Sequence, residues 1–258
     1  MTERILTSRD GAVLTITNND PATRNSLSRE FYDGLRETLE GIEEDASVRA
    51  VVLTGADGFF CSGGNINSLA ERKNSDYATV RAGVEHLHGM IRAMRNSSKP
   101  IIAAIEGGAA GAGAALALAC DMIVAANKAY LSVAYIRIGA TPDGGTTALL
   151  SKMVPPQMIA EMVFTGDRIP VERLHTMGVV NRLSQPGTTL ADAQALANQL
   201  AAGPPKAMAN AKRLLELSRS SAFETQLNAE AEGIARALLD EEAAEGLSAF
   251  LEKRAAKW

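Results

Sequence analysis

Short, almost uninterrupted runs of apolar residues recur along the first half of the chain. They occupy residues 50–54 (AVVLT), 101–105 (IIAAI) and 122–125 (MIVA). Runs of this length without polar alternation are typical of strands whose two faces are both buried. Glycine-containing loops and helical patterns lie between the runs. This alternation of strand, loop and helix predicts an α/β core with parallel strands.

The N-terminal segment has a pattern that predicts a β-hairpin and then a helix. Two apolar runs are separated by Arg-Asp-Gly at residues 9–11, and Asp-Gly between such runs is a turn signal. Asn25 and Ser26 precede a helical pattern over residues 27–44, and a second helical pattern covers residues 77–96. Polar residues of this kind favour helix starts.

The second half of the chain changes in pattern after Pro142. From about residue 144 it is almost entirely helical, with one short strand predicted at Val179 and Val180. Ala, Leu, Glu and Lys dominate three further helical segments, which cover residues 188–203, 204–219 and 221–254.

These patterns predict two parts: an α/β core over residues 1–195 and a C-terminal helical region over residues 196–258. In the helical region, we expect Lys206, Lys212 and Arg213 to lie on a solvated face, with contact to a coenzyme A arm as the alternative.

Composition excludes several classes of protein. The chain has 258 residues and a net charge of −4, whereas nucleic-acid binding requires a concentrated basic face. Glu106 and Asp121 interrupt the most apolar stretch, residues 101–125, so no membrane span is expected. The charged N-terminus predicts no signal peptide. Two cysteines without metal spacing predict reduced core thiols in a cytoplasmic protein, and the three histidines form no metal pattern.

Two loops rich in glycine and small residues carry the candidate chemistry. Residues 61–65 (CSGGN) and 107–113 (GGAAGAG) each follow a predicted buried strand. Such loops expose backbone N–H groups, and two convergent donors can stabilise an enolate or a tetrahedral oxyanion. The second loop also opens a helix, whose N-terminal end favours negative charge. A dinucleotide fingerprint is excluded because Leu116 stands where its third glycine belongs.

Several sequence blocks together resemble the crotonase, or enoyl-CoA hydratase/isomerase, superfamily. The resemblance runs nearly end to end, and the blocks lie at residues 24–27 (RNSL), 60–65 (FCSGGN), 99–104 (KPIIAA), 107–121, 141–145 (TPDGG) and 245–254 (EGLSAFLEKR). It implies an α/β fold built as a spiral of ββα turns, followed by a C-terminal helical trimerisation region. It also implies an acyl-CoA substrate, coenzyme A entering only as part of that substrate, and a homotrimer or a dimer of trimers.

The resemblance also implies roles for particular residues. Backbone amides of Gly64 and Ala112 would form the oxyanion hole around the thioester oxygen. Four residues and the Gly64 loop would contact the coenzyme A arm: Arg24, Leu27, Ser62 and Ile66. Lys253 could reach a phosphate, including one in a neighbouring subunit. No metal site is implied.

The chain departs from the hydratases of this family at two positions. Hydratases use two glutamates to handle water, and their places are taken here by Ala115 and Tyr135. A proton carrier is still required beside the thioester. Some isomerase-type members of the family, which this chain resembles, use an aspartate at the place of Asp143 in the Pro-Asp-Gly-Gly turn. From this resemblance we hypothesise that Asp143 is the carrier, and that isomerisation or ring opening of an unsaturated or ring-derived acyl group is favoured over hydration.

Each of these two residues also has a simpler interpretation. Asp143 could cap a turn or a helix, and Tyr135 could pack or donate a hydrogen bond, with packing the more frequent case. A second hypothesis for the whole chain is an acyl-CoA-binding protein of the same fold with little catalytic activity.

Overall fold

A six-stranded sheet forms the centre of the computed structural model, which describes residues 3–258. Its order is β1-β2-β3-β4-β6-β9. The strands are β1 (Ile5–Asp10), β2 (Val13–Asn18), β3 (Ala50–Gly55), β4 (Ile101–Ile105), β6 (Met122–Ala126) and β9 (Arg182–Ser184). The β1–β2 hairpin is antiparallel, and every other pair in this sheet is parallel.

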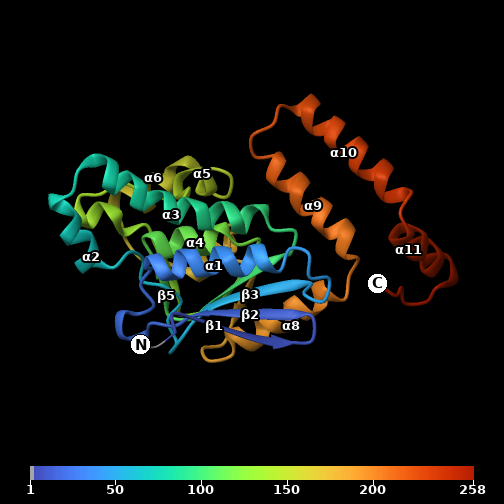
Figure 1. Ribbon diagram of the computed structural model, residues 1–258, viewed down its shortest axis with the longest axis horizontal. Helices are drawn as coiled ribbons and strands as arrows, with labels where there is room; N and C mark the ends of the chain where they lie inside the picture. Colours follow the sequence, from blue (N-terminus) through green and yellow to red (C-terminus); the bar gives the residue numbers. More distant parts are fainter. Residues whose placement is uncertain (1–2) are drawn as a thin grey trace.

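Helices cover both faces of this sheet (Figure 1). On one face lie α1 (Arg29–Gly41), α3 (Tyr77–Asn96) and α4 (Ala112–Ala119), and on the other lies α8 (Thr189–Ala201). Alternate residues of β3 therefore enter different cores: Val51 and Leu53 pack towards α1 and α3, whereas Val52 packs against α8. This two-sided burial explains why the strands read as continuous apolar runs.

A smaller second sheet gives the fold its spiral form. It consists of β5 (Gly108–Ala110), β7 (Tyr130–Ser132) and β8 (Ile169–Pro170), in the order β5-β7-β8. β4 is followed by β5, and β6 is followed by β7. In the same way, β3 leads to a bridge between Cys61 and Ala109, and β2 leads to a bridge between Leu27 and Gly64. The predicted α/β spiral of ββα turns is confirmed.

Short helices lie in the connections between these strands and helices. They are α2 (Ile66–Glu71), α5 (Thr146–Leu150), α6 (Pro156–Thr165), α7 (Val171–Thr176) and the 3₁₀ turns η1 (Pro21–Thr23), η2 (Arg72–Asn74) and η3 (Ala134–Ile138). The C-terminal helices α9 (Pro205–Leu217), α10 (Phe223–Leu238) and α11 (Glu241–Glu252) extend away from the core (Figure 1). Residue 195, the predicted end of the α/β core, lies inside α8, and this helix packs on the sheet. The division into the two parts 1–195 and 196–258 stays a prediction.

The hairpin, the three buried strands and the helix over residues 77–96 are confirmed, the last with the same bounds. The strand predicted at Val179 and Val180 is wrong. Val179 donates its N–H back to the Leu174 carbonyl at 2.9 Å, closing the end of α7. The strand β9 begins after this turn, at Arg182.

The expected solvated position of Lys212 is also wrong. Its side chain is only 8% exposed and forms an ion pair with Asp121 at 2.7 Å. It also donates to the Lys99 carbonyl at 2.8 Å. Arg95 lies in the same cluster and donates to Glu216 of α9 at 2.9 Å. These ion pairs attach α9 to the core. Each buried charge has a partner, which offsets the cost of removing it from water.

Candidate active site

The first glycine loop follows β3 and is held against the second loop by backbone hydrogen bonds. Cys61 donates its N–H to the Gly108 carbonyl at 3.2 Å, and its own carbonyl accepts from Ala110 at 3.0 Å. Gly63 has a φ of +92°, and a Cβ there would meet the Ala110 carbonyl at 2.5 Å. Only glycine allows this backbone conformation and this approach together.

The second glycine loop turns β5 into the start of α4. Gly111 precedes the helix with φ 53° and ψ −126°, a conformation open to glycine but not to residues with a Cβ. Two residues later, a Cβ on Gly113 would lie 2.5 Å from the Cys61 carbonyl oxygen. The second loop therefore lies directly against the backbone and the side chain of Cys61.

Two backbone N–H groups remain without an acceptor where the loops meet. Within residues 3–258, neither Gly64 nor Ala112 donates its N–H to another group of the protein. Both residues line the same cavity. The amide nitrogen of Ala112 lies 3.3 Å from the Cβ position of Gly63, so the two donors are close neighbours. Paired donors of this kind can hold an oxyanion, and the start of α4 adds a favourable dipole.

A third segment, residues 24–27, supports the first loop. Asn25 is fully buried, and its side-chain amide donates to the carbonyls of Ala56 and Phe59 at 2.8 and 2.5 Å. Arg24 accepts a hydrogen bond from the Ser62 N–H at 3.0 Å, and Leu27 donates to the Gly63 carbonyl at 2.8 Å. The loop that carries the Gly64 donor is thus held from both sides.

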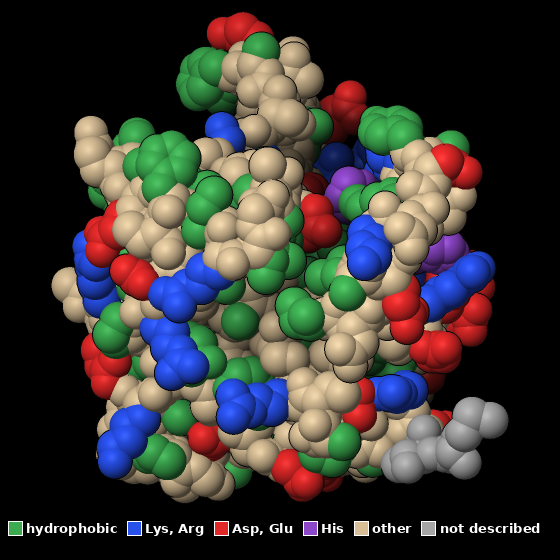
Figure 2. Space-filling view, turned by 90° about the vertical axis from the view of Figure 1, so that its left-hand side faces the viewer, with side chains coloured by type: hydrophobic (Ala, Val, Ile, Leu, Met, Phe, Trp, Pro, Cys, Tyr) green, Lys and Arg blue, Asp and Glu red, His purple; other side chains and the backbone are tan. Residues whose placement is uncertain are grey.

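A cavity of about 670 Å³ opens in front of these donors. Its walls come from the start of α1, from α2 and α3, from the two glycine loops and from η3 with the turn that follows. Figure 2 looks at the side of the molecule that carries α2, where hydrophobic side chains gather near the centre and Lys and Arg side chains lie around them. An apolar cavity with a few convergent polar groups is the usual form of a small-molecule site.

Asp143 presents its carboxylate to this cavity and is held by Tyr135. The Tyr135 hydroxyl donates to Asp143 Oδ1 at 2.6 Å. Burial and the neighbouring Asp143 charge raise the pKa of Tyr135 above its usual range, so the hydroxyl remains a donor at neutral pH. Tyr135 therefore does more than pack. Asp143 does not cap α5 with its side chain, since the N-cap residue is Gly145 and no side chain caps the helix.

Ala115 lies directly beneath this turn. It is fully buried, and a Cβ on Gly144 would meet the Ala115 Cβ at 2.8 Å.

Tyr32 of α1 reaches the same region. Burial is the main cause that raises the pKa of Tyr32, and the Asp143 charge raises it further. Burial also raises the pKa of the Cys61 thiol to about 12, so this thiol stays neutral.

The structure brings most of the predicted site residues together around one cavity. Those that line it are Leu27, Ser62, Gly64, Ile66, Ala112 and Asp143. Arg24 lies just behind the Ser62 loop, with its guanidinium 5.7 Å from the centre of the Phe59 ring. Lys253 does not line the cavity; it ends α11, at the opposite end of the molecule from α2 (Figure 1).

Sequence reasoning missed several residues that line the cavity. They include Tyr32, Leu69, Arg72, Val84, Leu87 and Arg137. Leu69, Arg72, Val84 and Leu87 come from α2, η2 and α3, and Arg137 comes from η3.

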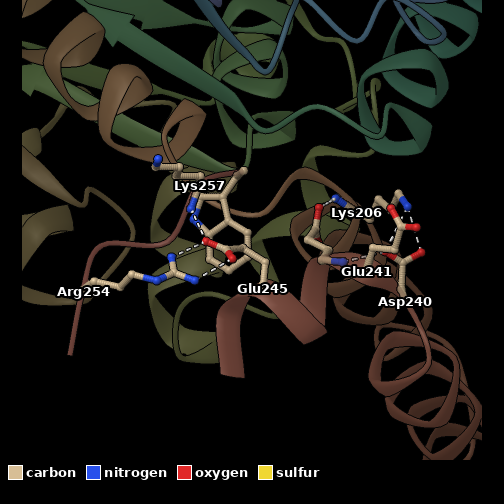
Figure 3. Close-up of a pocket in the computed structure, with 8 residues that line it drawn as sticks. Lys206, Asp240, Glu241, Glu245, Arg254 and Lys257 are labelled. Carbon is tan, nitrogen blue, oxygen red and sulfur yellow. Dashed lines mark hydrogen bonds and ion pairs between the residues drawn. The ribbon is translucent and has the colours of Figure 1, made fainter. Parts of the chain in front are cut away.

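A second cleft, of about 630 Å³, lies at the C-terminal end of the molecule (Figure 3). Its charges pair with one another: Lys206 contacts Asp240 at 2.8 Å, and Arg254 contacts Glu245 at 2.6 Å. Lys257 donates its backbone N–H to Glu245 at 2.8 Å. Neither glycine loop reaches this cleft, so the cavity at Gly64 and Ala112 is the candidate active site.

Two further observations concern metal ions and membranes. Across residues 3–258, no three His, Cys, Asp or Glu side chains gather as metal ligands would. His86 instead contacts Asp33 at 3.1 Å, and His88 lies 3.5 Å from Glu85. In the same part of the chain, no helix is long and apolar enough to span a bilayer.

The fold and the position of the cavity define the class: this is a crotonase-fold protein. Among solved structures, an enoyl-CoA hydratase from Polaromonas sp. JS666 superposes with a TM-score of 0.96 at 37% identity, covering 98% of each chain. One from Streptomyces coelicolor A3(2) superposes with a TM-score of 0.94 at 32% identity, covering 99% of this chain and 94% of the other.

Sequence comparison agrees with the structural comparison. The profile of the enoyl-CoA hydratase/isomerase family matches residues 8–258. The 1,2-epoxyphenylacetyl-CoA isomerase of Escherichia coli K12 is 32% identical over 98% of this chain and 97% of its own length. The 2,3-dehydroadipyl-CoA hydratase of the same strain is 34% identical over 97% and 96%. The chain belongs to the enoyl-CoA hydratase/isomerase family, and the expectation of an enzyme of this lyase and isomerase family is confirmed.

Proposed function

We propose that the protein acts on an acyl-CoA thioester and moves a proton within its acyl group. The N–H groups of Gly64 and Ala112 would hold the thioester oxygen, and Asp143 would carry the proton. The observation that carries this proposal is the Asp143 carboxylate at the cavity, oriented by the Tyr135 hydroxyl at 2.6 Å.

The proposed chemistry requires only these groups. Asp143 takes a proton from a carbon next to the unsaturated or strained part of the acyl group. The electron pair of that C–H bond moves towards the thioester oxygen, where Gly64 and Ala112 stabilise the enolate. Asp143 then returns the proton to another carbon, which shifts a double bond or completes a ring opening. No metal or redox cofactor takes part, and coenzyme A enters as part of the substrate.

Isomerisation or ring opening is favoured over hydration by the surroundings of Asp143. Hydration needs a group that activates water, and the nearest neighbours of this turn are the Ala115 methyl and the Tyr135 hydroxyl, which stays protonated. A relative named as an isomerase of a ring-derived acyl-CoA is 32% identical over almost the whole chain. Relatives named as hydratases and dehydratases lie at similar identity.

We place the coenzyme A arm at the mouth of the cavity. Leu27, Ser62 and Ile66 line that region, Ile66 with 60% of its surface exposed, and Arg24 lies behind it. The location proposed for the protein is the cytoplasm, in agreement with its two free, buried thiols.

We further propose a homotrimer or a dimer of trimers, built through the C-terminal helices. Apolar side chains on these helices are widely exposed, including Ile234 at 58%, Leu239 at 91% and Phe250 at 82%. Burying them against another copy would remove apolar surface from water. In such an assembly Lys253 could serve a neighbouring cavity. Sedimentation of the wild type and of Leu239→Glu tests this: a monomeric wild type contradicts it.

The test of the function is Asp143→Asn, assayed with a panel of 2-enoyl-, 3-enoyl- and ring-derived CoA thioesters. We expect kcat to fall by roughly 100- to 10,000-fold, the usual contribution of a proton carrier. Asp57→Asn, at an exposed position outside the cavity, is the matched control. An unchanged kcat in Asp143→Asn would remove this carboxylate from the mechanism.

Calorimetry with the same thioesters separates catalysis from binding. If the wild type binds them tightly and converts none, the alternative of a binding protein with little catalytic activity replaces the proposed enzyme. Exchange of substrate C–H for deuterium in heavy water gives an independent measurement, because proton abstraction produces exchange even when the net reaction is slow.

A further inference from the structure

One cationic side chain inside the cavity has no role in the proposed proton transfer. Arg72 begins the 3₁₀ turn η2, between α2 and α3. Within residues 66–79 it alone is partly buried, and every other residue is exposed. It also lines the cavity. Ile66, Ser68 and Leu69 of this segment also line the cavity, but Arg72 is its one partly buried residue and its one cation there.

The guanidinium lies against α3 at a position without a side chain. A Cβ on Gly83 would be 3.3 Å from Nη1 and 3.5 Å from Cζ of Arg72, so the absent side chain leaves room for the planar group. Leu87 follows one turn later on α3 and lies 3.5 Å from the Cβ position of Gly144, beside Asp143. Gly83 and Leu87 are four residues apart, which corresponds to a rise of about 6 Å along the helix. Arg72 beside Gly83 and Asp143 beside Leu87 are therefore separated by roughly one helical turn along the cavity wall.

The electrostatics of Tyr32 agree with this placement. Burial is the main cause that raises the pKa of Tyr32; the Asp143 charge raises it further, and the Arg72 charge lowers it. One hydroxyl therefore lies within range of both charges. The carboxylate and the guanidinium act on the same inner part of the cavity.

Arg72 has no counter-ion within the described residues 3–258. The other two cations that line the cavity are paired: Arg29 lies 3.4 Å from Asp33, and Arg137 lies 2.6 Å from Asp167. Apart from Asp143, the cavity is lined by one other carboxylate, Glu30, which is exposed, accepts from Ser28 and lies near Arg29. A partly buried guanidinium without a partner is a site for a ligand oxyanion.

We propose that Arg72 binds a carboxylate at the far end of the acyl group, so that the preferred substrates are acyl-CoA thioesters with a second, distal carboxylate. The proposal rests on the function proposed above, because it places the reacting carbons at Asp143 and the rest of a short acyl chain along Leu87 and Gly83. A coenzyme A phosphate offers the same oxyanion chemistry, and the experiment separates the two sources.

The test compares two enoyl thioesters of equal chain length, one ending in a carboxylate and one in a methyl group, each as the CoA and as the pantetheine thioester. The variants are Arg72→Met, Arg72→Lys and Lys73→Met. Lys73 lies in the same turn but outside the cavity, so its variant removes an equal charge without touching the site.

For the wild type we expect kcat/KM to be at least about tenfold higher with the carboxylate substrate. Arg72→Met should lower that value by about 10- to 100-fold, the loss expected for a charged hydrogen bond, while the methyl substrate changes less than about twofold. Arg72→Lys should restore part of the loss, and Lys73→Met should behave as the wild type with both substrates.

Two results would overturn the proposal. Equal losses for both acyl groups as CoA thioesters, absent with pantetheine, would assign Arg72 to a phosphate. An unchanged preference for the carboxylate in Arg72→Met would remove Arg72 from recognition altogether. If the wild type binds both thioesters but converts neither, the proposed function fails by itself, and the ratio of the two Kd values still tests Arg72.

Discussion

Contact between the two glycine loops makes Gly113→Ala a sharp test of the oxyanion site. The added methyl would lie 2.5 Å from the Cys61 carbonyl oxygen and 2.8 Å from its Sγ. Both are closer than the 3.4 Å at which ordinary contact begins. Since a backbone oxygen cannot rotate away as a flexible side chain could, the loop and the start of α4 must separate by roughly 0.5 to 0.9 Å.

That separation acts directly on the two free donors. Gly64 lies three residues after Cys61, and Ala112 immediately precedes Gly113, so moving the loops apart changes the spacing of their N–H groups. A misplacement near 1 Å can cost about 100-fold in rate, and loss of one oxyanion donor costs about 100- to 1,000-fold. We therefore expect kcat to fall by about 100-fold, with a smaller change in KM because the oxyanion develops in the transition state.

The assay is steady-state turnover of the best thioester in the panel, with thermal unfolding as a check of folding. Gly89→Ala is the control, because Gly89 lies within α3 and a Cβ there meets nothing within 4 Å. This control should keep full activity and gain up to about 1 kcal/mol in stability. A folded Gly113→Ala variant with kcat within threefold of the wild type would refute the proposed role of the two loops.

Three further predictions concern stability, thiol chemistry and the orientation of the carboxylate. Lys212→Met should lower the free energy of unfolding by about 3 kcal/mol in urea titration, because Asp121 loses its buried partner at 2.7 Å. At pH 8 a disulfide reagent should label neither cysteine until the protein unfolds, since the pKa of Cys61 is raised to about 12 and the second cysteine is buried too; rapid labelling of the native protein would contradict this. Tyr135→Phe should lower kcat by about tenfold with little change in KM, because the Asp143 carboxylate loses the hydroxyl that orients it at 2.6 Å; a raised KM with an unchanged kcat would instead indicate a loss of binding.

The parts of the fold that could be predicted are those whose environment is uniform along the chain. Residues 101–105 are buried on both faces, so each is apolar and the strand appears as an unbroken run. The helix over residues 77–96 has a polar cap and a periodic apolar face, with Met90 and Met94 buried. The glycine loops were recognisable because close backbone contact leaves no alternative to glycine at Gly63.

The elements that escaped prediction are short and depend on distant partners. β8 has two residues and exists because Ile169 pairs with Leu131 of β7. In the sequence, Lys212 resembles any exposed lysine of a helix. Only the packing of α9 on the core brings it to Asp121, with which it forms an ion pair. Local pattern contains no information about such pairings, since the partner lies in another element.

The same reason explains why the cavity was only partly predictable. Asp143 was a candidate from its turn, but the Tyr135 hydrogen bond that orients it depends on how η3 folds back onto that turn. Arg72 lies in a run of exposed polar residues and has no sequence signal at all. Its inward direction follows from the path of η2 over α3, where Gly83 leaves space for the guanidinium.

This division between predictable and unpredictable residues has a physical basis in how the site is anchored. The donors at Gly64 and Ala112 belong to loops that follow buried strands, and Asn25 fastens the first of these loops through two side-chain hydrogen bonds, to the carbonyls of Ala56 and Phe59. The wall that carries Arg72 belongs to residues 66–79, which are otherwise exposed. A substitution in that wall disturbs no core contact, whereas a Cβ at Gly113 displaces both loops. Recognition of the acyl group can therefore change while the oxyanion site stays intact, which agrees with a family whose members share the fold but are named for different acyl groups.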